Sequence, residues 1–125
     1  MVVFAAVLER SSLSAGIAPG PAIDVTHLSR MTLGERDLER EVLALFDRQA
    51  DMLLPRIRGG APALAAASAH TLKGSATGIG AFRVAEAAAA VELAKEHDEN
   101  IEAAVETLAA VLDEAKAEIA RLLAD

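Results

Sequence analysis

Apolar residues recur every three or four positions along most of the chain, which is the spacing of helices with one buried face. The most regular stripe predicts a helix over residues 101–123. Its members are Ile101, Val105, Leu108, Leu112, Ala115, Ile119 and Leu122. A second stripe predicts a helix over residues 35–58, in which Pro55 could introduce a kink or an early end. Its inward positions are expected at Leu38, Val42, Leu45, Phe46, Leu53 and Ile57.

Glycine, proline and polar residues divide the rest of the chain. Asp24 is suited to cap a short helix that ends near Met31, with Leu28 and Met31 facing inward. Pro62 suits the first turn of a helix, and it follows a pair of glycines that ends the segment before it. The remaining predicted elements are a helix over 62–78, a tight glycine turn at 78–80, a helix over 81–97 and a polar turn at 98–100.

Four amphipathic helices with short connections pack best as an antiparallel up-down bundle. We therefore predict an all-α fold, an antiparallel up-down four-helix bundle over residues 22–125. Residues 1–21 are predicted to be an N-terminal extension or linker, because they end in a stretch rich in serine, glycine and proline.

Composition supports the helical prediction and excludes several classes of function. Hydrophobic residues make up 53% of the chain, many of them alanine, the best helix former, and aromatic residues only 2%. The formal net charge of −7 argues against nucleic-acid binding. The absence of cysteine excludes disulfides, thiolate metal sites and a cysteine nucleophile. The apolar opening, residues 1–8, is shorter than the roughly 20 residues of a membrane span and lacks the basic start of a signal peptide. We expect a cytoplasmic protein without membrane contact.

The predicted helix over 62–78 places one histidine on a face of small side chains. Projected at about 100° per residue, Lys73 and Gly74 share the face of His70. The opposite, core face is expected to hold Leu64, Ala65, Ser68, Leu72, Ser75, Ala76 and Ile79.

This face suits phosphoryl chemistry. Gly74 costs the helix about 1 kcal/mol relative to alanine, and clearance beside His70 would explain it. The Lys73 ammonium could approach phosphoryl oxygens, and Thr77 and Arg83 could touch an incoming partner. A lone helical histidine is more often an ordinary surface or packing residue, so it is the conjunction of His70, Lys73 and Gly74 that indicates a site.

The segment around His70 resembles the signature of histidine-containing phosphotransfer (HPt) domains. It reads AHTLKGSA at 69–76 and continues as GIGA at 78–81. The family pattern has a histidine, a lysine and a glycine three and four residues later, a small residue, and another glycine ten residues after the histidine. Further matches are Ile23, Asp24, Leu45, Phe46, Asp47, Val84, Ala88, Val91 and Glu92, so the resemblance covers residues 22–123.

The resemblance implies a four-helix bundle with a short N-terminal lid helix that carries phosphate between aspartates. It makes His70 the phosphoacceptor, Lys73 a stabiliser of the phosphoryl group and Gly74 a source of steric clearance. The implied partners are the receiver domain of a hybrid histidine kinase and the receiver domain of a response regulator. The required Mg²⁺ would sit in the receiver, so the chain itself is expected to need no cofactor or metal.

Other interpretations stay open at this stage. The sequence shows no phosphate-cradling glycine loop or kinase-like pattern, so we expect a carrier that relies on its partners for catalysis and is not itself an enzyme. One alternative is a non-transferring helical adaptor that binds receiver domains, and another is a phosphoacceptor module served directly by a kinase. His27 and His97 have no companions at metal-ligand spacing. Neither the kinase, the response regulator, the pathway nor the oligomeric state follows from the sequence.

Overall fold

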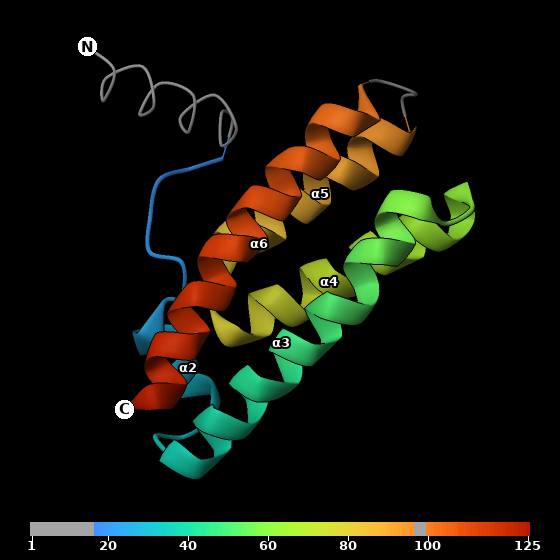
Figure 1. Ribbon diagram of the computed structural model, residues 1–125. Coiled ribbons are helices and arrows are strands. Elements are labelled where there is room, and N and C mark those ends of the chain that lie inside the picture. The colour runs from blue at the N-terminus through green and yellow to red at the C-terminus, as the bar shows by residue number, and fades with distance from the viewer. Residues whose placement is uncertain (1–16, 97–99) are drawn as a thin grey trace.

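The computed structural model describes residues 17–96 and 100–125, and every regular element in these two ranges is a helix (Figure 1). The helices are α2 (Val25–Met31), α3 (Arg36–Gly59), α4 (Pro62–Ile79), α5 (Phe82–Glu96) and α6 (Ile101–Ala124). The all-α prediction is confirmed, and the predicted helix bounds agree to within about two residues. Residues 1–16 lie outside the described residues, as do His97 and the first part of the predicted polar turn. The division of the chain at residue 21 therefore stays a prediction.

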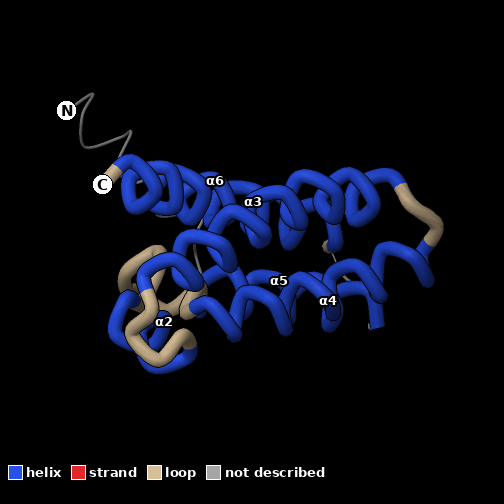
Figure 2. The backbone as a smooth tube through the Cα atoms, turned by 90° about the horizontal axis from the view of Figure 1, so that it is seen from below, coloured by secondary structure: helices blue, strands red, loops and turns tan. Residues whose placement is uncertain are grey.

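The long helices pack side by side around one core. α3 packs against α4, α4 against α5, α5 against α6, and α6 against α3, while the short α2 contacts α4. In the view of Figure 2, α3 and α6 form the upper half of the molecule, and α4 and α5 lie below them. The largest fully buried side chains between them are Leu72, Leu108, Leu112, Ile119, Val84, Val91 and Val111.

The inward face of α3 differs in part from the predicted stripe. Leu38 and Leu45 were expected inside and are exposed, whereas Leu43 and Ala50 are buried. The buried residues of α3 are Leu43, Phe46, Ala50, Leu53 and Ile57. This set follows a regular three-four spacing, and Leu45 stands about 100° around the helix from Phe46. Several apolar residues on neighbouring faces made the local pattern compatible with either choice, and the packing of α4 and α6 selected one.

Two smaller expectations are corrected as well, and the possible early end of α3 at Pro55 is decided. Met31 faces solvent, because α2 is only seven residues long and buries Leu28 alone. Leu64 is exposed in the first turn of α4, whereas Ala65 and, one turn later, Ala69 pack inward. Pro55 does not end α3, which continues to Gly59.

A glycine turn joins α4 to α5 and receives α2. Gly80 has φ +86, and the backbone N–H of Ala81 donates to the Ala76 carbonyl at 2.8 Å, which closes the helix end. The N–H of Asp24 donates to the Gly80 carbonyl at 2.9 Å. A Cβ atom at Gly80 would lie 2.7 Å from the Asp24 carbonyl oxygen. Only glycine therefore satisfies both the left-handed backbone and the contact with α2.

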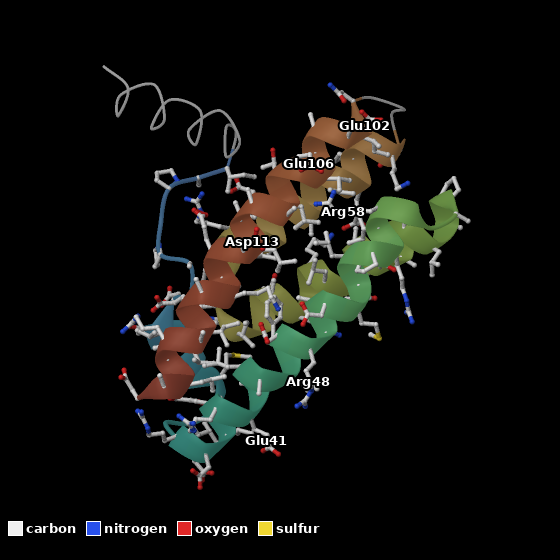
Figure 3. The ribbon with its side chains drawn as sticks, in the orientation of Figure 1. Glu41, Arg48, Arg58, Glu102, Glu106 and Asp113 are labelled. Atoms are coloured by element: carbon white, nitrogen blue, oxygen red, sulfur yellow. The ribbon has the colours of Figure 1, made fainter. Side chains whose placement is uncertain are left out.

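Ion pairs join α3 to α6 along their outer edge. Arg58, near the end of α3, lies 2.7 Å from a carboxylate oxygen of Glu106 (Figure 3). Further along, Lys116 Nζ lies 2.7 Å from Oδ1 of both Asp47 and Asp51. Because Lys116 bridges two carboxylates one turn apart, it fixes the position of α6 along α3 more firmly than a single exposed pair would.

Candidate functional site

His70 stands in the middle of α4 and points away from the core. Its side chain is 71% exposed, while its neighbours Ala69 and Leu72 are fully buried. The buried residues of α4 define one face, so the helical repeat turns His70 outward. Its surroundings on the exposed face are the small residues Ala63, Ala66, Ala67 and Gly74.

Glu92, on the neighbouring helix α5, contacts both the imidazole of His70 and the ammonium of Lys73. One of its carboxylate oxygens, Oε2, lies 3.2 Å from Nδ1 of His70. The other oxygen, Oε1, lies 3.0 Å from Nζ of Lys73. The Glu92 side chain is only 26% exposed, so these contacts form at the seam between α4 and α5. A single carboxylate thus holds His70 and Lys73 together.

Lys73 and Gly74 lie where the helical projection puts them, on the face of His70. The Lys73 side chain, expected to face solvent, is 37% exposed because it leans toward Glu92. A Cβ atom built on Gly74 would meet nothing within 4 Å. Packing against the described residues therefore does not require a glycine at this exposed position, in contrast to Gly80.

The comparison with known proteins identifies the family. The family model described as Hpt domain matches residues 36–125. The chain belongs to the Hpt domain family. The match takes in α3 to α6, and with them His70, Lys73, Gly74 and Glu92, whereas α2 precedes it. No curated protein and no solved structure matches the chain significantly.

Membership in the Hpt family connects the chain with phosphorelay signalling, in which Hpt domains interact with receiver domains. Because an ionised carboxylate only accepts hydrogen bonds, the His70–Glu92 contact requires the proton of the ring to sit on Nδ1. In a neutral imidazole the free lone pair is then on Nε2. The contact with Glu92 therefore leaves the lone pair of a neutral His70 ring on Nε2, the ring nitrogen that does not contact Glu92.

Hollows flank α4 of the Hpt domain on both sides. Toward α5, next to Glu92, lies a hollow of about 410 Å³ lined by Pro62, Ala66, Glu92, Lys95, Glu96 and Ile101. Toward α3 lies a mostly apolar hollow of about 480 Å³, lined by Val42, Leu45, Phe46, Arg48, Gln49, Met52, Ser75 and Ile79. Between them, the residues of α4 that surround His70 on its exposed face are the small Ala63, Ala66, Ala67 and Gly74, which leaves the imidazole open to a large partner.

The other candidate residues of the sequence analysis lie away from His70 or make local contacts. The Thr77 hydroxyl donates to the Lys73 carbonyl at 2.9 Å. Arg83 turns toward α6, where its guanidinium lies 3.6 Å from Glu114. The His27 ring packs edge-on against Phe82, with 5.0 Å between the ring centroids.

Glu92 is the residue whose role the sequence did not reveal. It matched the family pattern as the acidic member of a pair on the next helix, but no spacing rule connects positions 70 and 92. Within the described ranges, no group of three or more histidine, aspartate or glutamate side chains is arranged to hold a metal ion. No helix in these ranges is long and apolar enough to cross a membrane.

Proposed function

We propose that this Hpt domain is the phosphoryl carrier of a multistep phosphorelay, with His70 as the phosphoacceptor. It accepts a phosphoryl group from the aspartate of a receiver domain fused to a hybrid histidine kinase and passes it to the aspartate of a response regulator. The observation that carries this proposal is the exposed His70 imidazole, held by Glu92 through Nδ1 so that Nε2 keeps its lone pair.

In the proposed transfer, the Nε2 lone pair attacks the phosphorus atom of an aspartyl phosphate. The N–P bond forms, the P–O bond to the aspartate breaks, and the aspartate leaves as a carboxylate. The Nδ1 proton stays on the ring and faces Glu92. Onward transfer is the reverse reaction with the second receiver. The transition state is loose and needs positioning and charge neutralisation more than covalent assistance.

Lys73 and Gly74 have separate roles in this proposal. The Lys73 ammonium moves toward the phosphoryl oxygens and offsets their charge as a point cation. Gly74 leaves space beside His70 for the partner's active site, which is supported by the open space where a Cβ atom at Gly74 would stand. Lys73 and Gly74 are enough beside His70 in this proposal, because the receiver supplies the Mg²⁺ needed for transfer. The chain is therefore a carrier and not an enzyme, and it needs no cofactor of its own.

The proposed function also implies a specific arrangement of the helices. We propose that α3 to α6 form the antiparallel up-down four-helix bundle of the family, and that α2 serves as its lid helix. The hydrogen bond from Asp24 to Gly80 and the burial of Leu28 support this role for α2. We propose a cytoplasmic location, where both kinds of receiver domain would be met.

The test is transfer of radiolabelled phosphate from a panel of phosphorylated receiver domains to the protein, with His70→Gln beside wild type. A matched control is His27→Gln, which removes a histidine that packs on Phe82 and lies outside the site. We expect label on wild type and on the control but not on His70→Gln. Equal labelling of His70→Gln and wild type would show that a residue other than His70 accepts the phosphoryl group. If wild type bound receiver domains but took up no label, the protein would be a non-transferring adaptor and not a phosphoryl carrier.

A further inference from the structure

The contact between His70 and Glu92 bears on the phosphorylated state as well as on the free one. The two atoms, Nδ1 and Oε2, are 3.2 Å apart, and the phosphoryl group would be added at the opposite ring nitrogen. Addition of phosphorus at Nε2 therefore does not displace Glu92. A ring that carries a phosphoryl group on Nε2 and a proton on Nδ1 has a formal positive charge, and the carboxylate would then lie directly beside it.

We propose that Glu92 keeps the Nδ1 proton on phosphorylated His70, so that His70 leaves as a neutral imidazole when the phosphoryl group moves on. This inference rests on the proposed carrier function. In the onward step the N–P bond breaks, its electron pair returns to Nε2, and phosphorus bonds to the receiver's carboxylate. If the Nδ1 proton were lost first, the same step would have to expel an imidazolate anion, which is a far poorer leaving group. Glu92 is in this view a positioning residue for the donor reaction.

The negative charge of the Glu92 carboxylate strengthens its hydrogen bond to a positively charged ring. A carboxylate stabilises the positively charged, protonated ring more than a neutral amide of the same shape does, because hydrogen bonds to ionised groups are stronger. Glu92 is three-quarters shielded from solvent, which limits the screening of this attraction. We expect the carboxylate to favour the protonated form by roughly tenfold over an amide.

Other charged groups near His70 act less directly. Lys73, on α4 itself, disfavours a positive ring, but its ammonium is held by Glu92 Oε1 and is drawn to the phosphoryl oxygens. On α5, Lys95 and Glu96 line the hollow next to Glu92 and carry opposite charges. On the α3 side, the charged residue along the hollow is Arg48, and α2 brings His27 only to Phe82. Among these groups, only Glu92 makes a hydrogen bond to the ring.

The experiment measures ring protonation directly and needs no cognate receiver. Nitrogen-labelled protein is phosphorylated with phosphoramidate, a small phosphoryl donor, and the two ring nitrogens of His70 are followed by NMR from about pH 5 to about pH 8. Wild type is compared with Glu92→Gln, which keeps a hydrogen-bond acceptor but removes the charge. The control is Glu96→Gln, which removes the same charge one turn along α5.

We expect phosphorylated His70 to keep its Nδ1 proton up to a higher pH in wild type and Glu96→Gln than in Glu92→Gln. The expected difference is about one pH unit, which corresponds to the tenfold preference of the carboxylate for the protonated ring. Phosphoryl transfer to a receiver domain should fall with rising pH earlier in Glu92→Gln than in wild type. Identical titration of the phosphorylated ring in wild type and Glu92→Gln would overturn the inference, as would phosphorylation at Nδ1 or no phosphorylation of His70 at all. The carrier function stands or falls separately, by label transfer from receivers at a single pH.

Discussion

His70 and Glu92 are separated by 22 positions in the chain, yet His70 Nδ1 lies 3.2 Å from Glu92 Oε2. Their contact depends on how far α5 is shifted along α4. The turn at Gly80 sets this register, since it closes α4, starts α5 and bonds to Asp24 of the preceding segment. The chemistry of His70 is thus tied to a backbone feature near the far end of its helix.

The first prediction concerns this turn. Gly80→Ala should destabilise the fold by about 2 kcal/mol or more, because alanine at φ +86 is strained and its Cβ would meet the Asp24 carbonyl at 2.7 Å. The matched control is Gly34→Ala, at φ +73 with nothing within 4 Å of the new Cβ, which should lose only about 1 kcal/mol. Denaturant unfolding of both variants measures the difference. A loss at Gly80 no larger than at Gly34 would show that the contact with α2 is unimportant.

The second prediction separates stability from transfer at Gly74. Gly74→Ala should raise the free energy of unfolding by about 0.5–1 kcal/mol, because the position is helical and the added methyl group meets nothing. It should slow phosphoryl transfer from a receiver domain, because the methyl group occupies the space beside His70. Gly78→Ala, one turn further along α4 and also unobstructed, is the control that should leave transfer unchanged. Transfer at the wild-type rate in Gly74→Ala would remove the clearance role.

The third prediction concerns Lys73. Lys73→Ala should slow transfer to His70 by roughly tenfold, the effect of losing one charge-assisted contact to the phosphoryl group. The fold should persist, because the side chain is partly exposed and its ion pair with Glu92 lies at the surface seam. Lys95→Ala, a change of the same kind on α5, should transfer phosphate normally. Circular dichroism of both variants checks the fold, and a full-rate Lys73→Ala would argue against the assigned role.

The fourth prediction concerns the ion pairs through which Lys116 of α6 contacts Asp47 and Asp51 of α3. Burial by itself lowers the pKa of Lys116, but its hydrogen bonds and attraction to Asp47 and Asp51 outweigh this, so the net pKa is raised above 10.5. A raised pKa in the folded state means that the bridge stabilises the fold fully below pH 10.5 and is lost as the pH rises through the folded value. Lys116→Met should therefore unfold more easily at neutral pH, by about 1 kcal/mol or less.

The check is the difference in unfolding free energy between wild type and Lys116→Met as a function of pH. Groups that titrate in both proteins cancel in this difference. It should be constant through neutral pH and shrink in the alkaline range. A difference that grew with rising pH would contradict the sign of the pKa shift and with it the bridging role of Lys116.

The sequence by itself determined the class of fold, the helices and the exposure of His70. Helical periodicity is a local property, so the stripe of α6 and the outward face of α4 could be predicted from spacing alone, and His70, Lys73 and Gly74 fall on one face for the same reason. The pattern of α3 was less decisive, because apolar residues occupy more than one of its faces. Burial of Leu43 and exposure of Leu45 follow from which neighbours pack against it.

Only the tertiary structure decided which residue of another helix meets His70. No periodicity relates Glu92 to a histidine on a different helix, since their distance depends on the register of α5 against α4. That register is fixed by the Gly80 turn and by the packing of small buried side chains such as Ala87 and Ala88. The histidine was evident from its own helix, whereas the carboxylate that orients its ring required the folded chain.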